Sequence, residues 1–178
     1  MLNGNEIIYQ IFVRNYSKEG TLDKVTEDLD RIKELGVDIV YLMPIHEIGV
    51  EARKGTYGSP YSIKDYFSIS PDLGKIENFQ NLVKKVHKLG MKIILDMVFN
   101  HTSHDSKLYY EHPEYYFYKN GKVGNRVGDW SDIIDLDTSR TDVQDYLVSV
   151  LQYWRNLGVD GFRFDVASII DFNVFVKA

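Results

Sequence analysis

One short segment places a carboxylate beside a cation at a spacing that could serve catalysis. It is Gly161-Phe162-Arg163-Phe164-Asp165. In a strand, successive side chains point to opposite faces, so Arg163 and Asp165 share a face. A guanidinium beside a carboxylate keeps the acid ionised and fixes its direction, which suits a nucleophile. The alternative is a buried ion pair with a purely structural role, and these residues alone leave both readings open.

Two further segments carry polar or aromatic groups that could line a site. In Asp96-Met-Val-Phe-Asn100-His101, a carboxylate ends an apolar run and is followed by an amide and an imidazole. Equally, Asp96 could cap a turn and His101 could be an ordinary loop histidine. In Tyr57-Gly-Ser-Pro-Tyr61, glycine and proline shape a loop and could present Tyr61 flat against a sugar ring. An aromatic residue in a globular chain is more often simply part of the core.

The elements that position these segments alternate along the chain. Apolar runs rich in β-branched residues predict strands, and apolar residues at helical spacing predict helices that end near a glycine. The expected strands cover residues 7–13, 37–43, 92–98 and 159–164, and the expected helices cover residues 22–35, 79–89 and 143–157. A last helix is expected to begin in the tail, residues 169–178.

Alternating strands and helices predict a parallel sheet with right-handed crossovers, either doubly wound or a (β/α) barrel. Asn15-Tyr16-Ser17 follows the first strand, where a dinucleotide-binding fold would carry a glycine-rich phosphate loop. The polar segments instead follow the carboxyl ends of strands, where barrel enzymes place their chemistry. The sequence therefore favours an α/β fold that is a partial (β/α)8 TIM barrel of about four βα units.

A long irregular stretch interrupts this alternation after the third strand. Residues 99–140 are aromatic, rich in histidine and studded with glycine, and they are too long for an ordinary connection. We expect three parts: residues 1–98 with the first barrel units, residues 99–140 as an inserted loop or small subdomain, and residues 141–178 with the third helix, the fourth strand and the start of the next helix.

Composition excludes several functional classes. The chain has 178 residues, of which 44% are hydrophobic, enough to bury a core. Its net charge is -5 and its lysines and arginines are scattered, so we expect no nucleic-acid surface and no membrane surface, and a neutral partner. It has no cysteine, and its first residues do not form a leader segment. We therefore expect a soluble, cytoplasmic protein.

Taken together, these segments resemble the α-amylase family, glycoside hydrolase family 13. Asp96 to His101 is similar to the family's first signature, Asp-x-x-x-Asn-His, and Gly161 to Asp165 is similar to its second. The resemblance extends over nearly the whole chain in the family's order. It also includes Ile8-Tyr-Gln-Ile11, Ser70-Pro-Asp-Leu-Gly74 and Asp135-Leu-Asp137.

The resemblance implies a retaining α-glycoside hydrolase or transglycosylase that acts on α-glucans such as starch, maltodextrin or glycogen. Asp165 would be the nucleophile and Arg163 would position it. His101 would hydrogen-bond the sugar being cleaved, Tyr61 would stack on that sugar, and Asp96 would support the site from behind.

The resemblance also implies a calcium ion, because Asn100 and Asp135 match positions that bind one in many members. Oxygen ligands from separate segments suit calcium. The chain departs from the family after the nucleophile, where Ser168 and Ile169 replace a Lys and a His that help to bind the acceptor sugar and the metal.

A retaining glycosidase needs two carboxyl groups about 5 Å apart. In this family the acid/base glutamate lies on the next strand, and Asp171 is the single acidic residue after Asp165. We therefore expect an amino-terminal half that is inactive alone and that self-associates through its open edge strands.

Two alternatives from other classes remain. One is a non-catalytic sugar-binding remnant that keeps Tyr61, His101 and Arg163. The other is a structural α/β domain whose Asp-Arg pair belongs to the core.

Overall fold

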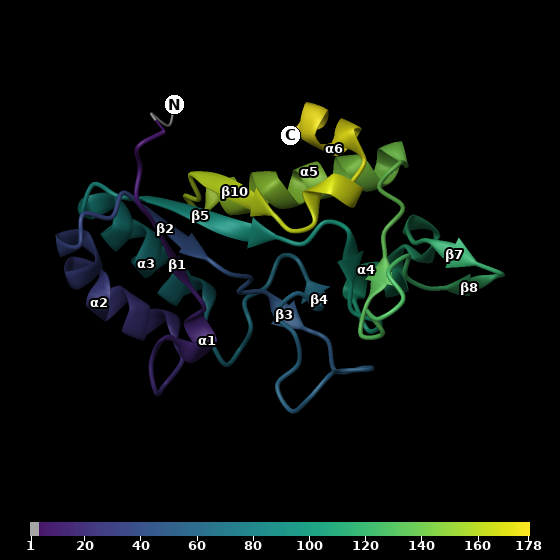
Figure 1. Cartoon of the computed structure of the whole chain (residues 1–178), viewed down its shortest axis with the longest axis horizontal. Helices are drawn as coiled ribbons and strands as arrows, with labels where there is room; N and C mark the ends of the chain where they lie inside the picture. Colours follow the sequence, from purple (N-terminus) through teal and green to yellow (C-terminus); the bar gives the residue numbers. More distant parts are fainter. Residues whose placement is uncertain (1–3) are drawn as a thin grey trace. The chain divides into compact units, whose positions relative to one another are not determined.

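The computed structural model describes residues 4–178, and its central element is a four-stranded sheet (Figure 1). The strands are β1 (Ile8–Ile11), β2 (Ile39–Leu42), β5 (Lys92–Met97) and β10 (Gly161–Phe164), in the spatial order β1-β2-β5-β10. The β1–β2 and β2–β5 pairs are parallel. Because the spatial order follows the chain order without the reversal of a doubly wound sheet, the partial (β/α)8 barrel is confirmed.

Three helices connect these strands: α2 (Leu22–Glu34), α3 (Ile76–Lys88) and α5 (Thr141–Asn156). The buried residues of α2 recur at helical spacing: Leu22, Val25, Leu29 and Ile32. Helices α2 and α3 pack together, and Phe79 of α3 meets the Trp154 ring edge to face at 5.3 Å. The expected helices are therefore confirmed to within a few residues. The expected first strand was too long, because a one-turn helix α1 (Val13–Tyr16) begins there.

The chain divides into two compact units that interleave along the sequence. One contains the residues up to Ile45, Ile69–Asp96 and Trp154–Arg163, and it includes most of the sheet. The other contains His46–Ser68, Met97–Tyr153 and Phe164–Ala178. The three-part division into residues 1–98, 99–140 and 141–178 stays a prediction.

The second unit contains three short strand pairs and several helices. Its strand pairs are β3 (Glu47–Ile48) with β4 (Ile63–Asp65), β6 (His101–Thr102) with β9 (Ile134–Asp135), and β7 (Tyr118–Lys119) with β8 (Lys122–Val123), all antiparallel. It contains most of α5, together with α4 (Lys107–Glu111), the 3-10 turns η1 (Pro113–Tyr115) and η2 (Ala167–Ile169), and α6 (Phe172–Lys177). The helix expected in the tail is therefore present. The β3–β4 pair was not expected, because its strands are too short to give a period. No helix among residues 4–178 has the length and apolar character needed to cross a membrane.

The core of this second unit contains two buried aromatic groups with polar atoms. The Tyr66 hydroxyl donates to the Val98 carbonyl at 2.5 Å and to the His101 carbonyl at 3.2 Å. The imidazole of His46, only 1% exposed, meets the Tyr66 ring edge on at 6.2 Å. Burial lowers the pKa of His46 to about 4, against the opposing effect of the Asp65 carboxylate. His46 is therefore neutral at pH 7.

We predict acid destabilisation from this histidine. Because the pKa of His46 is lower in the folded state than its usual 6.5, its contribution to stability is complete above pH 6.5 and is lost as the pH falls toward 4. The expected loss of free energy of unfolding at pH 4 is on the order of 3 kcal/mol. Urea titrations from pH 7 to pH 4 measure it. A His46→Gln variant, which cannot titrate, should show a shallower pH dependence, and an unchanged slope would contradict the assignment.

Candidate active site

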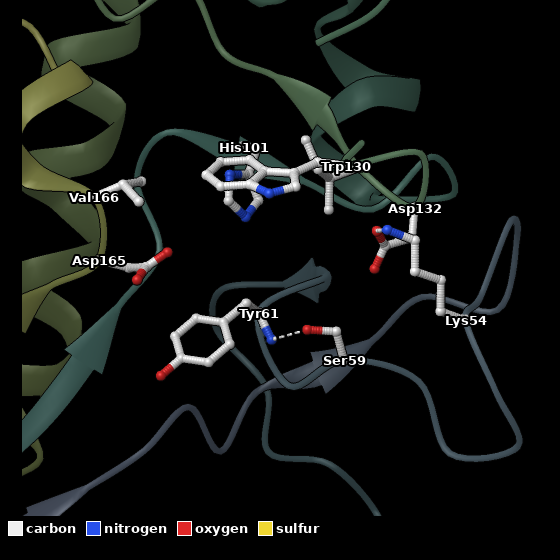
Figure 2. A pocket seen from close by; sticks show the side chains of 9 residues that line it. Lys54, Ser59, Tyr61, His101, Trp130, Asp132, Asp165 and Val166 are labelled. Atoms are coloured by element: carbon white, nitrogen blue, oxygen red, sulfur yellow. Dashed lines mark hydrogen bonds and ion pairs between the residues drawn. The ribbon is translucent and has the colours of Figure 1, made fainter. Parts of the chain in front are cut away.

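A pocket of about 320 Å³ lies within the second unit (Figure 2). Its volume is in the usual range for small-ligand sites. It brings together three of the residues expected from the sequence, namely Tyr61, His101 and Asp165. The remaining lining residues are Lys54, Ser59, Trp130, Asp132, Ile133 and Val166.

Asp165 directly follows strand β10 and is half-buried. Its backbone N–H donates to the Met97 carbonyl at 2.9 Å, which continues the pairing of β10 with β5 and fixes the start of the turn. The next residue, Val166, has φ 42° and ψ 41°, a left-handed conformation. This conformation is strained for a β-branched residue, and such strain concentrates at functional sites. The turn holds the Asp165 carboxylate toward the pocket, as Figure 2 shows.

His101 and Tyr61 reach the same pocket from strand β6 and from the loop before β4. Burial lowers the pKa of His101, while Asp135 and Asp165 act in the opposite direction. The imidazole is therefore neutral at pH 7 and can exchange hydrogen bonds with a sugar hydroxyl. Its Nδ1 lies 3.1 Å from Asn100 Nδ2. The Tyr61 backbone N–H donates to Ser59 Oγ at 3.2 Å, and this hydrogen bond stabilises the loop that carries the Tyr61 ring.

Three lining residues that the sequence analysis did not predict have defined contacts: Trp130, Lys54 and Asp132. Trp130 lies beside His101, with ring centroids 5.6 Å apart at 63°. Lys54 Nζ lies 3.0 Å from Asp132 Oδ1 and donates to the Asp129 carbonyl at 2.7 Å. The available signal was a tryptophan within Gly128-Asp129-Trp130, in a loop already expected to be functional.

Arg163 and Asp96 form an ion pair within the sheet. Nη1 of Arg163, on β10, donates to the two Asp96 oxygens at 3.0 and 3.2 Å. Asp96, on the neighbouring β5, is fully buried and also accepts a short hydrogen bond from the Tyr41 hydroxyl. Arg163 therefore forms an ion pair with Asp96 on the neighbouring strand, a partner that the sequence analysis did not predict, and the expected pair of Arg163 with Asp165 stays a prediction. The positioning role of Arg163 and the supporting role of Asp96 stay predictions.

The two residues expected to bind calcium lie together. Asn100 Nδ2 donates to Asp135 Oδ1 at 3.2 Å, and both residues are buried. The other oxygen, Oδ2, accepts from the Arg126 backbone N–H at 2.8 Å and from the Arg126 guanidinium at 3.3 Å. Among the described residues, no group of three or more His, Asp or Glu side chains is arranged to hold a metal ion.

These contacts match calcium in ligand type but not in arrangement. Calcium takes six to eight oxygen ligands. Here the positive charge beside Asp135 comes from Arg126, whose guanidinium also lies over the Phe117 ring at 4.3 Å and donates to the Leu136 carbonyl. A calcium ion would compete with that guanidinium for the carboxylate. Calcium stays a prediction of the resemblance, and no chemical step depends on it.

Replacing Arg126 tests this competition. Arg126→Met leaves a buried carboxylate without its guanidinium, and we expect it to lower the free energy of unfolding by about 1–2 kcal/mol. Calcium should then raise the Tm of the variant more than that of the wild type, because the charge of Asp135 is uncompensated. Thermal unfolding with calcium and with a chelator measures both. An equal calcium response in the two proteins would show that the ion binds with Arg126 in place.

Comparison with known proteins identifies relatives across the chain. The model of the family described as "Alpha amylase, catalytic domain" matches residues 3–133. Alpha-amylase 3 of Dictyoglomus thermophilum is 30% identical over 93% of this chain and 37% of its own length. Intracellular maltogenic amylase of Bacillus subtilis is 34% identical over 89% of this chain and 28% of its own length. The chain therefore spans about a third of the length of these curated relatives.

Solved structures agree with the fold. An α-amylase from Lactobacillus plantarum is 49% identical, with a TM-score of 0.95 over 97% of this chain and 41% of its own. A maltogenic α-amylase from Thermotoga neapolitana is 39% identical, with a TM-score of 0.90 over 97% of this chain and 42% of its own. With the family model matching most of the sequence, this chain belongs to the α-amylase catalytic-domain family.

Proposed function

We propose that this chain carries the nucleophile half of a retaining α-glycoside hydrolase or transglycosylase that acts on α-glucans. The observation that carries the proposal is the convergence of Asp165, His101 and Tyr61 on one pocket. A carboxylate, a neutral imidazole and an aromatic ring together supply a nucleophile, a hydroxyl partner and a stacking surface. These are the groups needed to hold and attack a sugar ring.

The proposed reaction begins with attack of an Asp165 oxygen on the anomeric carbon. A carbon–oxygen bond to Asp165 forms as the glycosidic bond breaks, and the leaving oxygen takes a proton from a general acid. Water or a sugar hydroxyl then attacks the same carbon and gives its proton to the group that acted as the general acid, which is now a base, and the Asp165 carboxylate is released. His101 and Tyr61 orient the ring through both steps.

The charges of the lining favour neutral sugars. Lys54 is paired with Asp132, and His101 is neutral. The lining therefore carries no excess positive charge to bind a phosphate group. Among the relatives is a trehalose-6-phosphate hydrolase of Bacillus subtilis, 28% identical over 92% of this chain. We propose neutral α-glucan oligosaccharides for this chain rather than phosphorylated disaccharides.

The 178 residues alone are proposed to be inactive on ordinary glycosides, for want of a proton donor. The other lining carboxylate, Asp132, is ion-paired with Lys54 at the far end of the pocket from Asp165 (Figure 2). The Asp171 side chain caps α6 by accepting from the Asn173 N–H. Loss of a general acid typically costs about 10²- to 10⁴-fold in rate. These occupied carboxylates also support the second candidate, a sugar-binding remnant without turnover.

Hydrolysis of maltooligosaccharides and pullulan separates these possibilities. The assay compares the chain itself with a chimera in which it replaces the matching part of the Lactobacillus plantarum α-amylase. We expect turnover by the chimera and none by the chain alone. An inactive chimera that still binds maltooligosaccharides would favour the remnant. Turnover by the chain alone would show that it contains a proton donor among its own residues.

The edges of the sheet favour association between copies of the chain. Strands β1 and β10 end the described sheet, and Ile7 and Ile8 are each 52% exposed. Unpaired apolar edges favour association between copies, so we expect light scattering to detect dimers or larger species. The Ile8→Lys variant should form fewer of them.

We also propose a cytoplasmic location, in keeping with the absence of cysteine and with the intracellular maltogenic amylase among the relatives.

A further inference from the structure

The pocket has two distinct ends. Figure 2 shows Asp165 and Val166 at one end, and Lys54 with Asp132 at the other. Trp130 and His101 lie on one side between these ends, with Tyr61 and Ser59 facing them. A glucan attacked at Asp165 can therefore extend past Trp130 toward Lys54 and Asp132.

The far end is held by contacts between two loops. Lys54 joins its loop to Asp132 and to the Asp129 carbonyl. Ser62 Oγ donates to the Asp132 carbonyl at 2.9 Å, and both of these residues are buried. The Asp132 side chain is 9% exposed, whereas that of Lys54 is 50% exposed. Asp132 is therefore a fixed, buried part of the far end. Lys54 is exposed, so it can be replaced without disturbing the core.

The backbone of Trp130 is also fixed by hydrogen bonds within its loop. Its carbonyl accepts from Asn125 Nδ2 at 2.8 Å, and its N–H donates to the Val127 carbonyl at 3.1 Å. The ring is half-buried against His101, which leaves part of its surface to the pocket. A fixed, partly exposed indole is a suitable stacking surface for a sugar, since it loses little conformational freedom on binding.

We propose that the Lys54–Asp132 pair closes the glycone end of the pocket and that Trp130 stacks on the last sugar unit accepted there. The pair acts as a specificity determinant: its ammonium and carboxylate bind the hydroxyl groups of the non-reducing terminal unit and leave no path beyond it. The enzyme would then take glucans by their ends. This inference rests on the proposed function, because it takes Asp165 as the point of attack.

Binding of two matched ligands tests the closure. Methyl α-maltoside and its 4,6-O-ethylidene derivative differ by a two-carbon group on the non-reducing unit. We expect the derivative to bind at least about tenfold more weakly, because it must displace Lys54. Lys54→Ala should reduce this discrimination to less than about twofold, while Lys54→Arg, which preserves the ion pair, should retain it. Lys122→Ala, on the exposed β8 strand, is the matched control.

Tryptophan fluorescence reports where the sugar lies. The chain has two tryptophans, and Trp154 is fully buried in the first unit, so a ligand-induced change should come from Trp130. Calorimetry on the Asp165→Asn chain gives affinities without turnover. Equal affinity of wild type for both ligands, or a maltoside that binds without changing the Trp130 emission, overturns the closure alone. Absence of heat for both ligands in every protein overturns the proposed function as well.

Discussion

Asp165→Asn is expected to abolish turnover of α-glucosidic bonds and to leave sugar binding intact. An amide of nearly the same shape keeps most contacts in the pocket but cannot form the covalent glycosyl intermediate. In the chimera with the Lactobacillus plantarum α-amylase, we expect a rate loss on the order of 10⁴-fold or more. The measurement is initial rates on maltooligosaccharides, with affinities from calorimetry.

The matched control for this prediction is Asp171→Asn. Asp171 is the next acidic residue along the chain, and its side chain caps α6 rather than lining the Asp165 pocket. Asparagine caps helices about as well as aspartate, so this variant should fold and retain activity. If Asp165→Asn retained wild-type rates, the pocket would not contain the nucleophile, and Arg163 and Asp96 would be left with a structural role.

Arg163→Met is expected to produce the largest change in stability. It removes the cation from a fully buried carboxylate, Asp96, which keeps the hydrogen bond from Tyr41. Breaking a buried pair costs about 3–5 kcal/mol, and because the Arg163 side chain is 43% exposed we expect about 2–4 kcal/mol here. Urea unfolding measures the loss.

A second substitution distinguishes an unpaired charge from lost packing. Arg163→Met combined with Asp96→Asn removes the uncompensated carboxylate, so the double variant should regain part of the stability lost in the single one. A double variant that is less stable than Arg163→Met by the full cost of Asp96→Asn alone would show that the two residues are not coupled.

The regular elements could be predicted because each one carries its own signal. Residues 92–98 form an apolar run, and α2 repeats its apolar residues at helical spacing, so local pattern and fold agree. The site was predictable where a motif carried it, as for His101 and Asp165. The turn after β10 then brings Asp165, and the loop before β4 brings Tyr61, to the pocket that His101 lines.

The remaining features depend on contacts between segments distant in sequence. Residue alternation predicted that Arg163 faces Asp165, and it could not predict that a neighbouring strand brings Asp96 within hydrogen-bonding distance of Arg163. Lys54 and Asp132 are far apart in sequence, and they meet because irregular loops fold toward each other. Arg126 likewise reaches Asp135 through a loop without a period. Local sequence patterns do not predict such contacts between distant segments.

The most direct test of Asp165 as the nucleophile is covalent labelling of the chain by a slowly hydrolysed α-glucosyl fluoride, such as the 5-fluoro derivative. Fluoride departs without protonation, so the reaction needs the nucleophile but no general acid. Intact mass spectrometry and peptide mapping should find one glycosyl group, attached to Asp165, and none in Asp165→Asn. An unlabelled wild-type chain, or a label on another residue, would contradict the account.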